Sequence, residues 1–135
     1  AREIDIEDLL CWAFREEQVE TSRTAHEDAL TIYWAVMALP GPFDQLIRHH
    51  ARIGRPPDWS VATEARVVHL VAVRYWRDRY SDWHRALTVL QRTVNGALRS
   101  YAASGPAAPA QPWRHTAAVV SRVPPRAASA PRSIR

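Results

Sequence analysis

Residues 83–101, WHRALTVLQRTVNGALRSY, carry large apolar side chains at the spacing of an α-helix. At about 100° per residue these side chains share one face; they are Trp83, Leu87, Leu90, Val94, Leu98 and Tyr101. Neither glycine nor proline interrupts residues 59–94, although Ser81 and Asp82 resemble the N-cap of a new helix. The spacing therefore predicts helical structure over residues 60–103, as one long helix or as two.

Two further helices are expected at the N-terminal end of the chain. Asp5 is a favourable N-cap for the first, whose apolar face would be formed by Ile6, Leu9, Leu10, Ala13 and Phe14. A capping-box pattern begins at Thr24 and precedes the apolar run of residues 29–39, ALTIYWAVMAL. Because this run is apolar on almost all sides, it predicts a central, buried second helix that ends at the Pro–Gly–Pro corner of residues 40–42.

A short third helix is expected over about residues 43–53, with Gly54 as its C-terminal stop. A fourth begins near Ser60. Beyond residue 103 the chain is rich in proline, alanine, serine and arginine, the composition of an extended or disordered segment. The predicted fold class is all-α, with a four- or five-helix domain over residues 1–103 and an extended Pro/Ala/Arg-rich basic tail over residues 104–135.

Charge is sorted along the chain, and every one of the 18 basic residues is arginine. Residues 1–28 hold nine acidic residues and three arginines, whereas residues 101–135 hold five arginines and no acidic residue. A cationic face or tail of this kind attracts phosphate groups or an acidic protein. The absence of lysine also fits the codon bias of a GC-rich genome, so the positions of the arginines are more informative than their identity.

The polar face of the expected third helix is the sharpest candidate site. Its side chains Gln45, Arg48, His49 and Arg52 fall within an arc of about 100°. With the preceding helix and the proline corner, this helix resembles the second helix of a helix-turn-helix unit. The resemblance implies that this face reads base edges in the major groove of DNA. An ordinary amphipathic helix with a solvated face has the same pattern.

Two more arginine features fit a nucleic-acid partner. A Gly-Arg-Pro triplet centred on Arg55 resembles the core of an AT-hook, which lies in the minor groove; a plain rigid loop is the alternative. Arg85, Arg92 and Arg99 recur every seven residues. On one continuous helix they would form a ladder with guanidinium groups roughly 10 Å apart. Such a ladder suits phosphates, an acidic helix such as the chain's own N-terminal one, or simple solvation.

Residues 74–85, RYWRDRYSDWHR, interleave four aromatic residues with four arginines. This composition is typical of surfaces that bind single-stranded nucleic acid and of protein-binding hot spots. However, Trp76, Tyr80 and Trp83 also have the spacing of core residues. In the tail, residues 117–123 have the character of a strand that adds to the edge of a sheet. The expected tail contacts are Trp113, Arg114, Arg122, Arg126 and Arg132.

The sequence contains no catalytic signature, because it lacks a glycine-rich phosphate loop and a serine-nucleophile motif. We therefore expect neither enzymatic activity nor a cofactor. The histidines lack ligand spacing, and the single cysteine, Cys11, is expected in the core, so neither a metal site nor an internal disulfide is predicted. No run of about 18 apolar residues and no apolar signal core occurs, so a cytoplasmic protein without a membrane span is expected.

Two functions remain open at this stage. The first is a non-enzymatic nucleic-acid-associated protein, for DNA rather than RNA, in which the third helix approaches the bases and the tail arginines clamp phosphates. A compact, lysine-free helical protein with a helix-turn-helix-like middle resembles small accessory proteins of bacterial phages. The second is a protein-interaction module, an assembly protein or an inhibitor. It would act on an acidic protein or on itself through the Trp/Arg-rich helix, the acidic N-terminal helix or the tail.

The pairing of the arginines discriminates between these two functions. A contiguous basic face around Arg48, Arg52 and Arg55 favours nucleic acid. Structure or assembly is favoured if the arginines are already paired with N-terminal carboxylates, namely Glu16, Glu17, Glu20 or Asp28.

Overall fold

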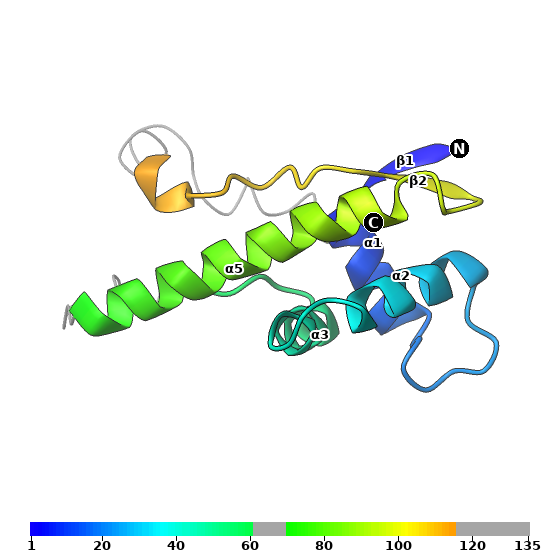
Figure 1. Ribbon diagram of the computed structural model, residues 1–135, viewed down its shortest axis with the longest axis horizontal. Helices are drawn as coiled ribbons and strands as arrows, with labels where there is room; N and C mark the ends of the chain where they lie inside the picture. The colour runs from blue at the N-terminus through cyan, green and yellow to red at the C-terminus, as the bar shows by residue number, and fades with distance from the viewer. Residues whose placement is uncertain (61–69, 116–135) are drawn as a thin grey trace.

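The computed structural model describes residues 1–60 and 70–115, and this part of the chain is mostly helical with one small sheet (Figure 1). The elements follow in the order β1 (Arg2–Asp5), α1 (Ile6–Cys11), η1 (Trp12–Glu16), α2 (Glu27–Met37), α3 (Phe43–Ile53), α5 (Leu70–Val94), β2 (Tyr101–Ser104) and η2 (Pro112–His115). The mostly helical class is confirmed. The start of the expected fourth helix, at residues 61–69, lies outside the described residues.

The two-stranded sheet was not predicted, and it adds a small β element to the mostly helical fold. β1 and β2 pair in parallel, with Arg2 opposite Tyr101 and Asp5 opposite Ser104. The helical stripe was expected to continue to Tyr101, but α5 ends at Val94, and Gly96 has φ +86°. This left-handed conformation turns the chain, because glycine adopts it without a Cβ clash. Residues 101–104 are thereby free to pair with the N-terminal strand.

α1 begins as predicted, because the Asp5 carboxylate accepts the Glu7 N–H at 3.0 Å. The helix continues into η1, a π-helical turn in which the Glu17 N–H donates to the Trp12 carbonyl. Cys11 is buried in α1, as expected. The apolar face predicted for this segment is confirmed, since all five of its residues are buried in the core.

α2 differs from its prediction in two respects. Its N-cap is His26 rather than Thr24, because the His26 Nδ1 accepts the Asp28 N–H at 2.9 Å. The helix is also not buried on all sides. Ile32 and Val36 are fully buried, whereas Trp34 is 66% exposed. Neighbouring elements cover one face of α2 only, so an apolar run does not by itself place a helix at the centre.

α3 has the predicted bounds, and Gly54 ends it with φ +76°. A Cβ at Gly54 would lie 2.0 Å from an Arg15 guanidinium nitrogen, but that flexible side chain can move, so it is the backbone conformation that favours glycine. α5 is continuous from Leu70 to Val94. Ser81 and Asp82 therefore do not begin a new helix, and the single-helix alternative holds within the described part of the chain.

The core forms where α1, α2 and α3 pack on one face of α5. The predicted stripe of α5 is buried at Trp83, Leu87, Leu90 and Val94. Trp76 was expected in the core but is half-buried. Figure 1 shows why: the N-terminal half of α5 projects beyond the other helices, so less of the protein surrounds it. Burial of the C-terminal half of α5 supplies the hydrophobic stabilisation of the fold.

The buried carboxylate of Asp28 joins the first turn of α2 to the chain that leads into β2. Asp28, 1% exposed, accepts the Arg99 and Ser100 N–H groups at 2.8 Å each and the Tyr101 N–H at 3.2 Å. Three hydrogen bonds to one carboxylate offset the cost of burying the charge of Asp28. They also set the position at which β2 begins.

We predict that Asp28→Asn lowers the free energy of unfolding by about 3 kcal/mol, because an amide NH₂ replaces one of the acceptor oxygens facing the backbone donors. Glu27→Gln is the matched control, since it removes the neighbouring negative charge in the same helical turn from an exposed side chain; its effect should stay within about 0.5 kcal/mol. Urea denaturation followed by circular dichroism measures both. Equal effects would contradict the anchoring role of Asp28.

Candidate functional site

The polar face of α3 carries arginines that are already paired within the molecule. Arg48 donates to Asp44 at 3.0 Å, one turn earlier on the same helix. Arg52 forms a two-pronged contact with Glu20, with distances of 2.7 and 2.5 Å. Gln45 and His49 are exposed. Both arginines of the face predicted to read bases therefore already have carboxylate partners within the molecule.

The Glu20–Arg52 pair has an electrostatic signature of its own. The hydrogen bonds from Arg52 lower the pKa of the Glu20 carboxyl, and the same contact raises the pKa of the guanidinium. The pair ties the loop after η1 to the last turn of α3. Arg55, in the following loop, is exposed and has no carboxylate partner among the described residues.

The predicted ladder of Arg85, Arg92 and Arg99 is only partly present. Arg85 and Arg92 lie on the exposed side of α5, and Arg85 approaches Asp82 at 3.6 Å. Arg99 is not on the helix, because the chain turns after Val94. Its side chain instead lies 3.5 Å from Glu27. The alternative that acidic residues pair with this set of arginines inside the molecule thus holds for Arg99, although its partner belongs to α2.

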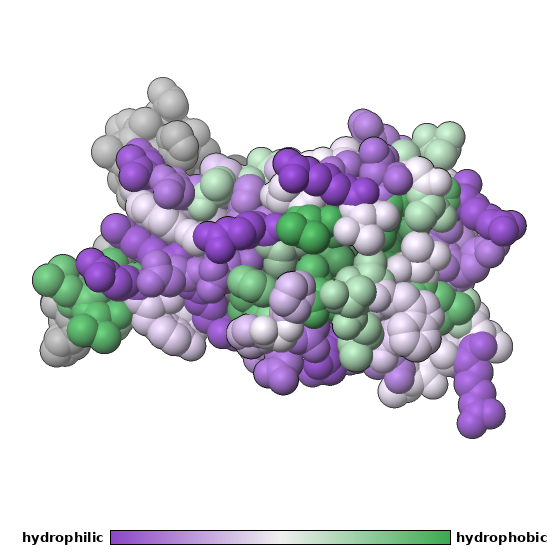
Figure 2. All heavy atoms as spheres, in the orientation of Figure 1, coloured by the Kyte–Doolittle hydropathy of each residue, from purple (hydrophilic) through white to green (hydrophobic). Residues whose placement is uncertain are grey.

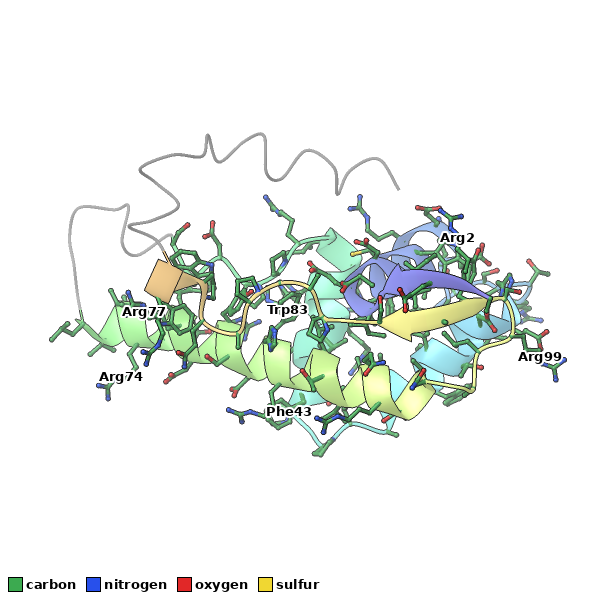
Figure 3. All side chains as sticks on the ribbon, turned by 90° about the horizontal axis from the view of Figure 1, so that it is seen from above. Arg2, Phe43, Arg74, Arg77, Trp83 and Arg99 are labelled. Carbon is green, nitrogen blue, oxygen red and sulfur yellow. The ribbon has the colours of Figure 1, made fainter. Side chains whose placement is uncertain are left out.

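Arg74 takes the place of Arg99 on the exposed face of α5. It lies eleven residues before Arg85, so the two side chains share a direction to within about 20°. Arg92 lies seven residues after Arg85 and points in nearly the same direction. All three are exposed. Figure 3 shows the Arg74 side chain pointing away from the body of the protein.

The described part of the tail packs on the protein itself. The Trp113 ring in η2 lies 6.0 Å from the rings of Trp59 and Tyr80, and the Arg77 guanidinium lies 5.3 Å from its centre. Such a cation–π contact favours Arg over an aromatic face, and Figure 3 shows Arg77 beside η2. Arg114 is exposed. The other tail contacts, Arg122, Arg126 and Arg132, lie outside the described residues, as does the strand-like stretch 117–123.

The projecting half of α5 exposes apolar side chains that the sequence interpretation missed. Leu70 and Val71 are each 81% exposed, and Tyr75 is 54% exposed. Figure 2 shows apolar spheres gathered at the end of the molecule where α5 begins. A signal was present, because Leu70 and Val71 lie more than about 100° from the buried Trp83 stripe on a continuous helix. We call this surface, Leu70, Val71, Arg74 and Tyr75, the α5 tip.

Grooves flank the α5 tip on both sides. One, of about 660 Å³, lies between α3 and α5; its apolar walls include Phe43, Leu46 and Tyr75, and its polar rim includes His49 and Asp82. The other, of about 580 Å³, lies between the start of α5 and Trp113 of η2. A partner that seats on the α5 tip can therefore reach into a groove on either side.

His50 is a buried side chain with a strongly perturbed pKa. Its Nδ1 donates to the Arg55 carbonyl at 3.0 Å, and its Nε2 is buried without a hydrogen-bond partner among the described residues. Burial lowers the pKa of His50 to about 4, aided by the charges of Arg79 and His49 and opposed by the Arg55 carbonyl. The neighbouring His49 is exposed, and its ring lies edge-on to that of His50 at 4.8 Å between centroids.

The fold defines a mostly helical protein with a small parallel sheet. No protein-family model matches the chain, and no curated protein or solved structure matches it significantly. None of the helices in residues 1–60 and 70–115 is long and apolar enough to cross a membrane. Within the same residues, no three His, Cys, Asp or Glu side chains gather as metal ligands. A function must therefore be argued from the surface itself.

The low pKa of His50 predicts a pH dependence of stability. Between about pH 6.5 and 4 the unfolded chain protonates this histidine while the folded chain keeps it neutral. Stability therefore falls as the pH falls, by at most about 2 kcal/mol between pH 7.5 and 5 from this group. His50→Asn keeps a donor near the Arg55 carbonyl but cannot titrate. Its unfolding free energy, from urea curves at both pH values, should fall less than that of the wild type; parallel losses would contradict this assignment.

Proposed function

We propose that the chain is a non-enzymatic protein-binding module whose contact surface is the α5 tip. The observation that carries the proposal is the exposure of Leu70 and Val71, each 81% exposed, in the first described turn of α5. Apolar side chains exposed together in this way are typical of interaction sites. The neighbouring arginines and Tyr75 add the residue types that dominate interface hot spots.

The charges around the α5 tip favour an acidic partner. Residues 70–80 hold three arginines and one acidic residue, Asp78. Arg74 is exposed and Arg77 lines the groove beside Trp113. The acidic groups of such a partner would therefore pair with the arginines of this region, and one apolar side chain of the partner would fill a groove. The internal pairing of Arg52 with Glu20 supports the same class of function, because those charges already hold the domain together.

A second candidate, nucleic-acid binding, is favoured by one specific observation. Arg74, Arg85 and Arg92 form an exposed line along α5, and such a line suits the phosphates of a nucleic-acid backbone. Base reading by α3 has less support, because Arg48 and Arg52 would first have to leave their carboxylate partners. This candidate thus shifts the contact from α3 to α5 and predicts affinity without strong sequence preference.

For the protein-binding function, we predict that Val71→Ser weakens partner binding about tenfold or more, since it places a hydroxyl in the apolar centre of the contact. Val89→Ser is the matched control, because Val89 is exposed on the same helix but outside the α5 tip. Affinity capture from cells that produce the protein, followed by titration of the captured protein, compares the two. A partner that both variants retain equally well would rule out the α5 tip.

For the nucleic-acid function, the test is binding of a fluorescent random-sequence duplex across a series of salt concentrations. If α5 contacts the phosphates, neutralising Arg74, Arg85 and Arg92 together with glutamine should reduce the slope of log affinity against log salt by about 2.7. Arg48→Gln should leave the slope unchanged. Absence of binding by the wild type at low salt would eliminate this candidate.

A further inference from the structure

After β2, residues 105–113 run along α5 as an extended segment with a proline at every third position (Figure 1). Pro106, Pro109 and Pro112 have no backbone N–H, so three of the nine residues of this segment lack a main-chain donor. A surface that supplies donors to the carbonyl groups can bind such a segment through its main chain.

α5 supplies donors of that kind. The Tyr80 hydroxyl donates to the Pro109 carbonyl at 2.9 Å, and His84 Nε2 donates to the Ala108 carbonyl at 2.8 Å. A carbonyl only accepts, so His84 carries its proton on Nε2 in this contact. Near the end of β2, Gln91 Nε2 donates to the Ala103 carbonyl at 2.9 Å.

The three donor residues occupy one strip of α5. At about 100° per residue, Tyr80, His84 and Gln91 lie within roughly 40° of one another. Arg77, which contacts the Trp113 ring, lies within about 60° of the same direction. We call Arg77, Tyr80, His84 and Gln91 the donor strip. It flanks the buried Trp83 stripe and is separate from the exposed line of arginines.

In addition to the hydrogen bonds from Tyr80 and His84, the segment has an anchor at each of its two ends. At one end the Ala107 N–H donates to Asp5 at 2.7 Å, and at the other Trp113 packs among Trp59, Tyr80 and Arg77. Between these anchors Pro109, Ala110 and Gln111 are exposed. The donor strip thus contacts carbonyl oxygens and one aromatic ring, and it leaves Ala107, Pro109, Ala110 and Gln111 exposed.

The geometry points to a peptide-binding site on the donor strip, which the chain's own residues 105–113 occupy. Its ligand class is an extended, proline-bearing peptide with an aromatic residue about four positions after the bound proline, since Pro109 and Trp113 have that spacing. Carbonyl recognition tolerates many side chains, so a segment of another protein with this chemistry competes with the resident one. This inference does not rest on the α5 tip being a docking surface.

The resident segment can leave without unfolding the domain. No residue of 105–113 is among the buried residues of the core, and Trp113 is the residue of this segment that packs against that core. Segments with few buried apolar contacts open at a small part of the global unfolding free energy. Opening would uncover the donor strip and the floor of the groove that Trp113 lines.

The test uses the full chain and a fluorescent peptide of residues 104–115, SGPAAPAQPWRH, with anisotropy as the readout. Trp113→Ala removes the aromatic anchor of the resident segment, so the peptide should bind this variant about tenfold more tightly than the wild type. Trp34→Ala, at an exposed tryptophan of α2, is the matched control and should bind as the wild type does. Adding Tyr80→Phe to Trp113→Ala should abolish the gain.

A second variant opens the other end of the segment. At Gly105, with φ +81°, a Cβ would lie 1.9 Å from an Asp5 carboxylate oxygen, so Gly105→Ala should also increase peptide binding. Gly96→Ala is its control, because Gly96 has φ +86° but nothing within 4 Å of the added Cβ. If both opened variants keep their circular dichroism spectra and neither gains affinity for the peptide, the site does not exist. If either loses its fold, titration of the wild type to millimolar peptide decides, and no binding there overturns the inference.

The oligomeric state distinguishes the proposed occupant, a segment of another protein, from a second copy of this chain. A monomer that binds the peptide in solution agrees with the proposal. A concentration-dependent dimer in light scattering that Trp113→Ala abolishes would make a second copy's residues 105–113 the competing ligand and would overturn the assignment to another protein.

Discussion

The fold depends on the contact between the Asp28 carboxylate and the main chain at residues 99–101. Its three hydrogen bonds span 71 to 73 positions in the sequence, and they place the beginning of β2 beside the N-terminus of α2. β2 then pairs with β1, and β1 leads into α1 through Asp5. An isolated two-stranded sheet is marginal in water. Here the strands are stable because charged caps fix both of their ends, and the sheet closes the chain around the core.

α5 has a different environment on each of four sides. One stripe, with Trp83 at its centre, is buried against the other helices. The donor strip on one flank contacts residues 103–113, and the opposite flank forms the groove with α3. The remaining side, with Arg74, Arg85 and Arg92, faces solvent. A helix of 25 residues is about 37 Å long, and the other elements cover only its C-terminal part on the core side. The α5 tip exists because the helix is longer than the domain that packs on it.

The parts of the fold that depend on neighbours in sequence were predictable. Pro42 and Gly54 bound α3 because proline and glycine act on the local backbone, and the 3.6-residue period placed the buried stripe of α5. The β1–β2 pairing was not predictable, since neither four-residue segment shows a clear alternation of apolar and polar residues and the two segments lie almost a hundred positions apart. The Glu20–Arg52 pair was among the alternatives that the sequence left open, but nothing local selects Glu20 among the N-terminal carboxylates, because the two residues are 32 positions apart. The exposure of Leu70 and Val71 could be predicted only if α5 was known to be one continuous helix.

The sorting of charge along the chain has a structural cause. Several carboxylates of residues 1–28 bind groups of this chain: Asp5 and Asp28 accept backbone N–H groups, Glu17 accepts the His26 N–H, and Glu20 and Glu27 pair with arginines. A carboxylate that accepts a backbone N–H group keeps its negative charge and is not thereby paired with an arginine. These acidic residues therefore do not pair one for one with the arginines of α5. Positive charge consequently remains on the outer side of α5, next to the apolar residues of the α5 tip. An acidic protein surface and a phosphate backbone are both complementary to that positive charge. Only the protein surface can also bury Leu70 and Val71, because the contacts of a nucleic-acid backbone are made by charged phosphates.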